Sequence, residues 1–415
     1  MKIGITRSFG DVLPLFINLA IYLKENGEEV FFIDPEPRVI WLLKKYKLDY
    51  LSSRKEIIHN NQITDETNTF LINMKTGLEQ LRKGDENNRY TMLKRRYLHK
   101  HSLFERTSFD LLIIWNGALS LEKRLAEKLS IDTVYLENGY FPDTLQIGRK
   151  GVNSNADFSD MNYDTFLAHT HLPSTSGLKK IITKDVTTHP IQNILNIGLL
   201  IYNPFDFLTK VLIYSRKMVA KFKTIFLREK HIVLPEKFIF IPFQVHDDTQ
   251  TLFNSPIIKK MNDILDFFYP EIKEVLPDHK IIVKEHPVDL GRADYNVLKK
   301  KYPDIIWLKK YNFNELLNKC DYVITVNSSS GLQAIEKYKK VLILGSCFYK
   351  NNPFTEYISR VPEFRDKLNI LKEKSLDKSH IDKYIKHFKK NIFIQGGLKN
   401  FRSETLVQIY AFIKS

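Results

Sequence analysis

The chain has 415 residues, of which 43% are hydrophobic and 27% are charged. This length exceeds one ordinary hydrophobic core, so two domains are expected, and the composition excludes a disordered or fibrous protein. The formal net charge of +15 indicates an anionic partner: nucleic acid, an acidic membrane surface or an acidic substrate. No RNA-binding aromatic motif, zinc-finger spacing or helix-turn-helix signature stands out in the sequence, so no nucleic acid partner is expected.

The two cysteines, Cys320 and Cys347, are too few for a disulfide framework or a thiolate metal site, which favours a reducing compartment. The first seven residues, Met1 to Arg7, are typical of a β-strand and not of a secretion signal. We therefore expect a cytoplasmic protein.

The chain begins with a predicted strand at 2–6, a helix at 12–25 and a second strand at 29–33. This order is typical of the start of a Rossmann-like domain. Arg7 follows the first strand, where it either binds an anionic group or is an ordinary surface arginine, and the sequence leaves both interpretations open. The basic run 94–101 is interpreted as a solvated helix face, with contact to phosphate as the alternative.

A predicted strand at 109–115, a helix at 121–129 and a strand at 133–136 lead to Glu137. Gly139 permits a tight backbone turn, and residues 143–153 are expected to form a loop. Glu137 either faces a ligand cleft or is a turn glutamate bonded to backbone amides.

Residues 191–230 combine a short apolar stretch with a basic amphipathic run. The apolar part is shorter than the roughly 20 residues needed to cross a bilayer. Two interpretations stay open: the segment lies in an acidic membrane interface, or it forms a helical hairpin packed at the domain junction.

Consecutive large apolar residues at 238–241 predict a strand buried on both faces, which Pro242 ends. Two carboxylates, Asp247 and Asp248, follow it. In an open α/β sheet, ligands bind at the carboxyl ends of the strands. The alternative is that these aspartates cap a following helix, expected at about 255–268.

Further units of strand and helix follow up to residue 344 and predict a second parallel sheet. The expected elements are strands at 279–284, 304–308, 321–326 and 341–344, with helices at 314–320 and 332–338. Asn327, Ser328, Ser329 and Ser330 precede one of these helices, where hydroxyl and backbone N–H groups suit an anion; a serine cap is the alternative. Lys284 and His286, at another strand end of the same sheet, favour a nucleotide phosphate.

These residues carry a family resemblance. Glu137-Asn-Gly-Tyr-Phe-Pro with Gly151-Val-Asn153, Gln244-x-x-x-Asp248-x-Gln250, Lys284-x-His-Pro287 and Asn327-Ser-Ser-x-Gly331 resemble, as a set, the motifs of retaining β-Kdo transferases of the capsule polysaccharide biosynthesis and O-antigen type. The resemblance spans about residues 130–345. It does not extend to residues 185–232.

The resemblance implies an α/β fold with two Rossmann-like domains facing a cleft, as in glycosyltransferase-B enzymes. It also implies CMP-β-Kdo as donor, a bacterial surface glycan or glycolipid as acceptor, and retention by double displacement. In that mechanism Asp248, rather than Asp247, attacks the anomeric carbon, and Glu137 is the base for the acceptor hydroxyl. His286 assists catalysis, while Lys284 and His286 stabilise the phosphate or the sugar carboxylate.

The residues predicted to bind the donor are Arg7, Gly139, Gln244, Lys284, His286, Pro287, Asn327, Ser328, Ser329 and Ser330. No Asp-x-Asp metal motif lies at a comparable strand end, so neither a metal nor another cofactor is expected. The expected domains are 1–185 on the acceptor side, a basic insertion at 186–234, a CMP-sugar-binding domain at 235–390, and a helix within 391–415 that packs back on the first domain.

Two other functions fit the same residues. An inverting sialyltransferase would use Glu137 as its sole base, with His286 assisting the phosphate and Asp248 structural. A non-catalytic component of an envelope polysaccharide complex would use the basic surface and residues 191–230 to contact the cytoplasmic face of the inner membrane.

Overall fold

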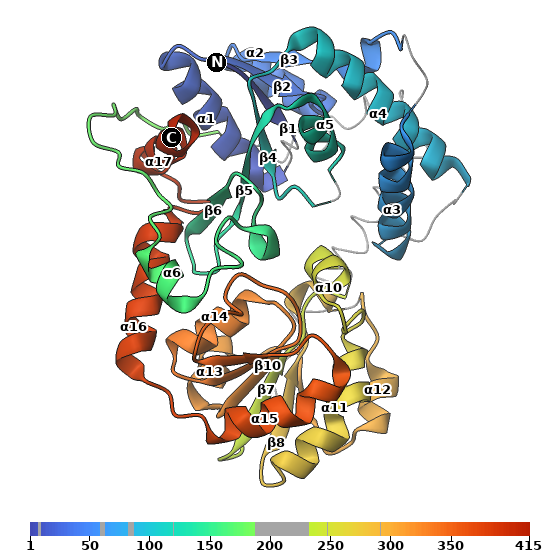
Figure 1. The fold of residues 1–415 in the computed structure, drawn as a ribbon, viewed down its shortest axis with the longest axis vertical. Coiled ribbons are helices and arrows are strands. Elements are labelled where there is room, and N and C mark those ends of the chain that lie inside the picture. Colours follow the sequence, from blue (N-terminus) through green and yellow to red (C-terminus); the bar gives the residue numbers. More distant parts are fainter. Residues whose placement is uncertain are drawn as a thin grey trace. The chain divides into compact units, whose positions relative to one another are not determined.

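The computed structural model describes residues 1–6, 10–58, 63–81, 87–118, 120–186, 232–246, 248–290 and 292–415. These residues fold into two compact units, the first comprising 1–157, 169–186 and 388–415 and the second comprising 158–168 and 232–387. Each unit is built on a sheet of its own with helices on its faces (Figure 1). The predicted α/β class with two Rossmann-like domains is therefore confirmed.

The described part of the first unit contains a seven-stranded sheet in the order β13-β6-β5-β4-β1-β2-β3. Its strands are β1 (Lys2–Thr6), β2 (Glu29–Ile33), β3 (Asp49–Leu51), β4 (Leu111–Trp115), β5 (Asp132–Asn138), β6 (Thr144–Gly148) and β13 (Ile394–Gln395). Its helices are α1 (Leu13–Glu25), α2 (Pro37–Lys45), α3 (Asp65–Leu81), α4 (Asn87–Thr107), α5 (Leu121–Leu129) and α17 (Ser403–Lys414). The pairs from β5 to β3 are parallel, whereas β6 runs antiparallel to both β5 and β13.

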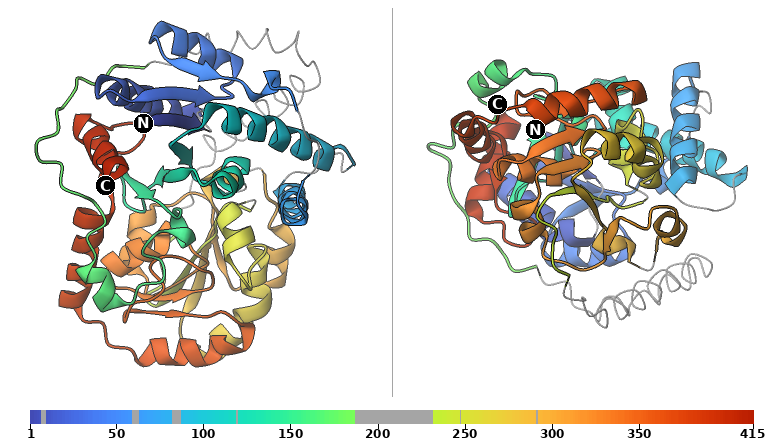
Figure 2. Two further views of the ribbon diagram at one scale, coloured as in Figure 1. Left: turned by 45° about the horizontal axis from the view of Figure 1, so that its top comes forward. Right: turned by 90° about the horizontal axis from the view of Figure 1, so that it is seen from below.

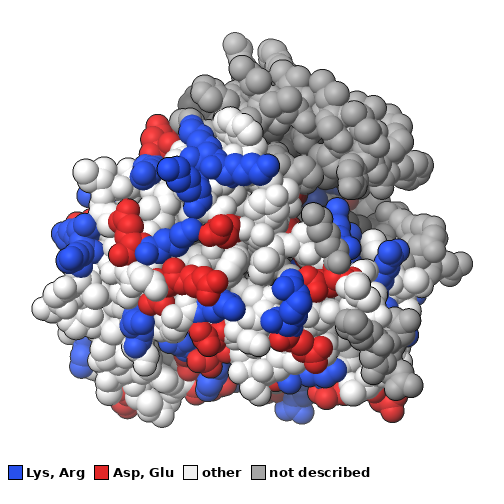
Figure 3. All heavy atoms as spheres, turned by 90° about the horizontal axis from the view of Figure 1, so that it is seen from above, with Lys and Arg blue, Asp and Glu red and all other residues white. Residues whose placement is uncertain are grey.

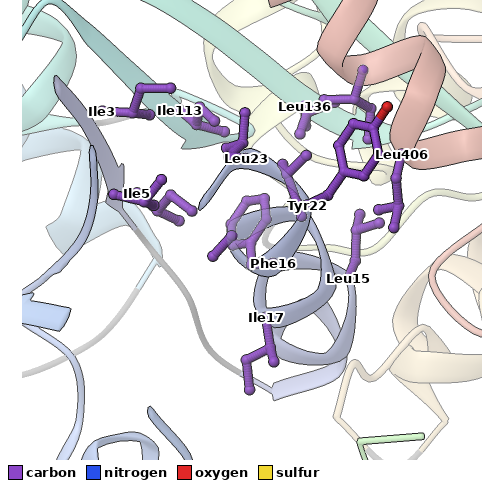
Figure 4. Close-up of a cluster of buried hydrophobic side chains, with 14 of the residues drawn as sticks. Ile3, Ile5, Leu15, Phe16, Ile17, Tyr22, Leu23, Ile113, Leu136 and Leu406 are labelled. Carbon is purple, nitrogen blue, oxygen red and sulfur yellow. The ribbon is translucent and has the colours of Figure 1, made fainter. Parts of the chain in front are cut away.

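Side chains of β4 alternate between two cores, as the two-residue period of a strand requires. Leu111 and Ile113 pack in a cluster with α1, α2 and α17, whereas Leu112 and Ile114 pack with α3, α4 and α5. Figure 4 shows part of the first cluster, where Leu406 of α17 lies beside Leu15 and Tyr22 of α1. Both faces of the sheet are covered, which explains the continuous apolar sequence of β4.

The C-terminal helix α17 belongs to this first core. Leu406 and Ile409 are fully buried, and the rings of Tyr22 in α1 and Tyr410 in α17 meet edge to face at 5.5 Å. Figures 1 and 2 both show α17 beside α1. Each fully buried leucine or isoleucine contributes about 1.5–3 kcal/mol, so residues 388–415 are an integral part of the first unit.

The second unit contains, within its described residues, a six-stranded parallel sheet in the order β12-β11-β10-β7-β8-β9. Its strands are β7 (Phe238–Pro242), β8 (Lys280–Lys284), β9 (Ile306–Leu308), β10 (Tyr322–Thr325), β11 (Lys340–Ile343) and β12 (Thr355–Tyr357). Its helices are α6 (Tyr163–Ala168), α10 (Thr249–Asn254), α11 (Asn262–Val275), α12 (Asn296–Lys301), α13 (Phe313–Lys319), α14 (Ser329–Glu336), α15 (Phe364–Glu373) and α16 (Lys378–His387).

Strand β7 lies between β10 and β8 and is buried on both faces. Ile239 and Ile241 pack in a cluster with α11 and α15, whereas the ring of Phe240 meets Phe313 of α13 at 5.7 Å.

The segment 158–168, which sequence analysis assigned to the first domain, packs in this unit, because Phe166 contacts Tyr384 and His387 of α16.

Two sequence expectations about secondary structure are wrong. The expected loop at 143–153 contains β6, whose five residues are all buried. The helix expected at 255–268 does not begin at 255: α10 ends at Asn254, residues 255–261 are not helical, and α11 runs from Asn262 past Phe268 to Val275 through Pro270. Segment 191–230 lies outside the described residues, so its contact with a membrane stays a prediction.

The basic run in α4 is not a solvated face throughout. Arg95 and Arg96 are exposed, but Lys100 is buried. Its Nζ lies 2.6 Å from Asp34 Oδ2 and 3.0 Å from Glu122 Oε1. Glu122 also accepts a hydrogen bond from Ser120 Oγ at 2.8 Å. The ammonium therefore neutralises two carboxylates between the sheet and its helices, and the interpretation of Lys100 as a surface lysine is wrong.

We expect Lys100→Met to destabilise the protein by about 3–5 kcal/mol, because it leaves two poorly exposed carboxylates without their cation. Lys24→Met is the matched control, since Lys24 pairs with Asp49 at 2.7 Å on the surface, and should cost less than about 1 kcal/mol. Urea unfolding of the first unit, followed by circular dichroism, measures both. Equal midpoints for the two variants would contradict the prediction.

The Lys100→Met deficit should also depend on pH. The Lys100 ammonium, against the opposing effect of burial, lowers the pKa of Glu122 from 4.5 to about 2. A lowered carboxyl pKa gives stability that is present above pH 4.5 and is lost as the pH falls toward about 2. The difference between wild type and variant should therefore shrink across that window.

Candidate active site

A hydrogen-bonded network joins the carboxyl ends of β7 and β10. Gln244, which is buried, donates from Nε2 to Asn327 Oδ1 at 3.0 Å and to Asp248 Oδ2 at 3.3 Å. The Asn327 backbone N–H donates to Gln244 Oε1 at 3.1 Å, and Asn327 Nδ2 donates to the Gln250 carbonyl at 2.9 Å. Three predicted residues, Gln244, Asp248 and Asn327, are thus brought together, and the network orients the Asp248 carboxylate.

Asp248 is also the N-cap of the short helix α10. Its Oδ1 accepts the Gln250 backbone N–H at 2.9 Å. The interpretation of Asp248 as a helix cap is therefore correct as far as it goes, although the capped helix begins at Thr249 rather than Ser255. A cap of this kind does not exclude chemistry, because a carboxylate has about four lone-pair sites. Asp247 lies outside the described residues.

Lys284 and His286 follow at the end of β8, the neighbour of β7. The Lys284 side chain is largely buried, and its Nζ lies 3.5 Å from the Glu285 carbonyl. His286 Nδ1 accepts the Val288 backbone N–H at 3.2 Å, which places the ring proton on Nε2. This strand end thus carries a cation and a neutral N–H donor.

Burial lowers the pKa of His286, and the charges of Lys284 and Arg292 lower it further against the opposing effects of Asp289 and Asp248. The ring is therefore neutral at pH 7, and it donates a hydrogen bond without carrying a charge. Lys284, Asp289 and Arg292 lie at or after the end of β8. Asp248 lies after the end of β7. Asp248 and His286 consequently belong to one electrostatic site.

The serines after β10 form the start of α14. Ser328 Oγ accepts the Ser330 backbone N–H at 3.2 Å and lies 2.9 Å from Ser330 Oγ. This is the cap that sequence analysis gave as the alternative to an anion site, while Ser329 is the first helical residue. Gly331 is needed here because a Cβ would lie 2.4 Å from the Tyr349 hydroxyl.

Pro287, at the end of β8, is exposed in the short 3-10 helix Pro287–Asp289.

The other predicted carboxylate, Glu137, belongs to the first unit. It lies within β5 and not beyond its end. Its Oε2 accepts from Asn116 Nδ2 at 2.5 Å and its Oε1 accepts the Asn138 backbone N–H at 2.8 Å. The bond from the Asn138 N–H fits the interpretation of a turn glutamate. The bond from Asn116, the residue after β4, shows that a side chain also positions the carboxylate.

Gly139 makes the turn between β5 and β6 possible. A Cβ at this position would lie 1.9 Å from Thr144 Oγ1, while the Gly139 N–H donates to the Thr144 carbonyl at 2.7 Å. The structure therefore gives Gly139 a packing role, and its predicted part in donor binding stays a prediction. Arg7 lies outside the described residues.

Sequence reasoning missed two residues that adjoin this network, His246 and Asp289. His246 Nδ1 lies 2.8 Å from Asp289 Oδ1, and Asp289 is fully buried. The available signal was their spacing: His246 lies inside the Gln244-x-x-x-Asp248 motif, and Asp289 lies two residues after Pro287.

Charged side chains of both signs share the face of the molecule drawn in Figure 3. On the face drawn in Figure 3, lysine and arginine side chains are interspersed with aspartate and glutamate, so the net positive charge does not form one uniform basic surface there. No helix in the described ranges has the length and hydropathy of a membrane-spanning segment. Among the same residues, no group of three or more His, Cys, Asp or Glu side chains is arranged to hold a metal ion.

Several known proteins resemble this chain. Protein FixF of Sinorhizobium fredii is 26% identical over 58% of this chain and 49% of its own length. The capsule polysaccharide export protein KpsS of Escherichia coli is 24% identical over 28% of this chain and 32% of its own length. The chain thus spans at most about half the length of these relatives. The structure of the Thermosulfurimonas dismutans KpsC β-Kdo 2,7 transferase aligns with 93% of this chain and 99% of its own at 14% identity, with a TM-score of 0.44.

The family model described as "Capsule polysaccharide biosynthesis protein" matches residues 118–396. This range holds Glu137 in the first unit and the strand ends of β7, β8 and β10 with Asp248, His286 and Ser328 in the second. The match covers more than half of the chain, and the chain therefore belongs to the capsule polysaccharide biosynthesis protein family.

Proposed function

We propose that this chain is a glycosyltransferase that moves Kdo from CMP-β-Kdo to a bacterial surface glycan or glycolipid with retention of configuration. The observation that carries the proposal is the second unit's cluster of strand ends, where an oriented carboxylate, Asp248, shares one electrostatic site with Lys284 and His286. A carboxylate beside groups that suit a phosphate is what displacement of a nucleotide by an enzyme nucleophile requires. Membership of a capsule biosynthesis family supports an envelope glycan as acceptor.

In the proposed first step, an Asp248 oxygen attacks the anomeric carbon while the bond from that carbon to the CMP phosphate breaks. The electron pair leaves with the phosphate, and Lys284 and the His286 Nε2–H stabilise its charge. In the second step, an acceptor hydroxyl loses its proton to Glu137 and displaces Asp248 from the sugar. Two inversions give overall retention.

Gln244 and Asn327 are proposed to hold Asp248 in line for attack, and Ser328, Ser329 and Ser330 to bind the phosphate at the start of α14. The donor needs no metal in this scheme, since a lysine, a neutral imidazole and a helix terminus supply the positive potential. Contact of residues 191–230 with the cytoplasmic face of the inner membrane is part of the proposal for the acceptor side.

An inverting CMP-sialic acid transferase is the second candidate. The observation that favours it is the N-cap role of Asp248, because a structural Asp248 leaves Glu137 as the only catalytic carboxylate. The two candidates differ in donor, in the anomeric configuration of the product and in the covalent adduct, which only the retaining mechanism forms.

Incubation with CMP-Kdo should release CMP and add one Kdo to the intact protein, as read by mass spectrometry. CMP-sialic acid should give neither result. With an acceptor from a panel of lipid-linked starter, lipopolysaccharide oligosaccharide and capsule repeat, product NMR should show a β-Kdo linkage. We expect EDTA to leave the rate unchanged, and restoration by Mg²⁺ of activity lost in EDTA would contradict metal-independent transfer. Release of CMP from neither donor with any acceptor would favour a non-catalytic component of a polysaccharide assembly complex.

A further inference from the structure

The second unit contains a histidine and aspartate pair outside the motifs that define the proposed site. His246 lies between Gln244 and Asp248, and 38% of its side chain is exposed. Its Nδ1 lies 2.8 Å from Asp289 Oδ1, and its backbone N–H donates to Asp289 Oδ2 at 2.8 Å. One carboxylate thus fixes both the backbone and the ring of His246.

Asp289 is held in place from several sides. Its side chain is fully buried, and the Tyr295 hydroxyl donates to Asp289 Oδ2 at 3.4 Å. Burial raises the pKa of Tyr295, so this hydroxyl keeps its proton. The Tyr295 ring packs on Phe243 with centroids 5.2 Å apart. A carboxylate buried among donors acts as an acceptor, so a proton lies on His246 Nδ1 and is donated to Asp289.

The two histidines of the site therefore use Nδ1 in opposite ways: His286 Nδ1 accepts a hydrogen bond, whereas His246 Nδ1 donates one. His286 Nδ1 accepts a backbone N–H at 3.2 Å, so His286 is a fixed Nε2–H donor. His246 Nδ1 instead donates to the buried Asp289 carboxylate at 2.8 Å. A carboxylate behind an imidazole is the usual support for a group that transfers protons. His246 is thus suited to move a proton, and His286 is not.

The position of the pair favours the leaving phosphate as the recipient of that proton. The Asp289 N–H donates to the His286 carbonyl at 2.9 Å, so His246 is tied to the segment that carries Lys284 and His286. Arg292 Nη1, a further cation, lies 3.9 Å from Asp289 Oδ1. In an in-line displacement the nucleophile and the leaving group are on opposite sides of the reacting carbon. Through Asp289, His246 is held at the β8 end, which carries the proposed phosphate-binding groups Lys284 and His286.

We propose that His246 is a catalytic residue whose Nε2–H donates a proton to the departing phosphate oxygen of the nucleotide, and that Asp289 is its positioning residue. This inference rests on the proposed function. As the bond from the anomeric carbon to the phosphate oxygen breaks, the electron pair stays on that oxygen, which takes the proton from His246. The nucleotide later releases this proton to solvent, and neutral His246 takes one up from solvent.

The test uses the full chain with His246→Gln, Asp289→Asn and the double variant. His380→Gln is the matched control, because His380 also pairs with an aspartate, Asp377, at 2.9 Å in the same unit but at the surface. The rate of CMP release from CMP-Kdo is measured together with the rate of the mass shift that marks the sugar adduct. We expect His246→Gln to slow both by about 10²-fold and His380→Gln to change them less than about twofold.

Comparison of the single variants with the double variant distinguishes a positioning role of Asp289 from a purely structural one. If Asp289 acts through His246, Asp289→Asn slows CMP release and the double variant is no slower than the slower single variant, because interacting residues are not additive. The inference would be overturned if the rate losses of the two single variants multiply in the double variant. It would also be overturned if His246→Gln released CMP at the wild-type rate. Since Asp289→Asn removes a buried acceptor and can impair folding, the His246→Gln result decides on its own if that variant unfolds.

A binding readout keeps this inference separate from the proposed function. In protein labelled with ¹⁵N-histidine, CMP should shift the Nε2 resonance of His246, which is assigned by its loss in His246→Gln. Failure of wild type to release CMP from CMP-Kdo would overturn the proposed function. Absence of the CMP-induced shift would overturn the contact of His246 with phosphate, whatever the activity.

Discussion

Asp248→Asn should reduce transfer of Kdo from CMP-Kdo by at least about 10⁴-fold, as expected when the nucleophile of a covalent mechanism is removed. The amide is too weak a nucleophile to displace CMP, so neither released CMP nor the adduct should accumulate. The measurement is CMP release, with intact-mass spectrometry of the protein after incubation with donor alone.

The structural role of Asp248 makes this variant informative. Asparagine is as good an N-cap as aspartate, so Asp248→Asn keeps the cap of α10, whose Gln250 N–H bonds the side chain at 2.9 Å. Thermal stability should therefore change little while activity is lost. If Asp248 served only as a cap, Asp248→Asn would retain transfer, and the inverting mechanism would be favoured.

The neighbouring aspartate supplies the control. Asp247→Asn should keep most of the transfer activity and still form the adduct, because the spacing from Gln244 selects Asp248. An adduct that persists in Asp248→Asn and disappears in Asp247→Asn would assign the nucleophile to Asp247 instead. A tryptic peptide that carries the sugar identifies the modified residue directly.

Apolar strands that are buried on both faces could be predicted from sequence, whereas β6, which depends on its hairpin partner, could not. Strands β4, β7 and β10 are buried on both faces, so each appears as a run of large apolar residues. Strand β6 has two polar residues and a glycine among five, and its strand character comes from pairing with β5. Pairing with a hairpin partner decides whether such a segment is a strand, and Gly139, in the turn after β5, was the signal in the sequence.

The break between α10 and α11 depends on side-chain bonds to the backbone. Asp263 Oδ2 accepts the N–H groups of both Lys259 and Lys260 at 2.8 Å, which holds a turn where a continuous helix was expected. Helix α11 then continues through Pro270 because Phe268, Ile272 and Val275 are buried on one face. Packing outweighs the loss of one backbone hydrogen bond at the proline, which propensity alone does not show.

Only those residues of the candidate site that belong to recognisable motifs could be predicted from the sequence. Lys100 appeared as part of a basic surface run because its partners, Asp34 and Glu122, are distant in sequence. Asp289 belongs to none of the motifs identified in the sequence, and only the fold brings it within 2.8 Å of His246 Nδ1. Tertiary contacts between charged groups leave no periodic pattern in a sequence, which is why both were missed.

The second large effect is expected at Glu137, and it differs in kind from that at Asp248. Glu137→Gln should slow transfer to the acceptor by about 10²–10⁴-fold, the usual contribution of a general base. The first step needs no base, so one equivalent of CMP should be released in a burst and the Kdo adduct on Asp248 should accumulate. Rapid-quench measurement of CMP together with intact mass detects both.

Glutamine retains the shape and the contacts that place the Glu137 side chain, since its amide oxygen still accepts from Asn116 Nδ2 or the Asn138 N–H. Asn116→Ala, which removes one of these bonds but no base, should weaken transfer less than Glu137→Gln and should not trap the adduct. An adduct that turns over at the wild-type rate in Glu137→Gln would show that another group takes the acceptor proton. Loss of the burst would instead place Glu137 before the first displacement, as an inverting mechanism with a single carboxylate requires.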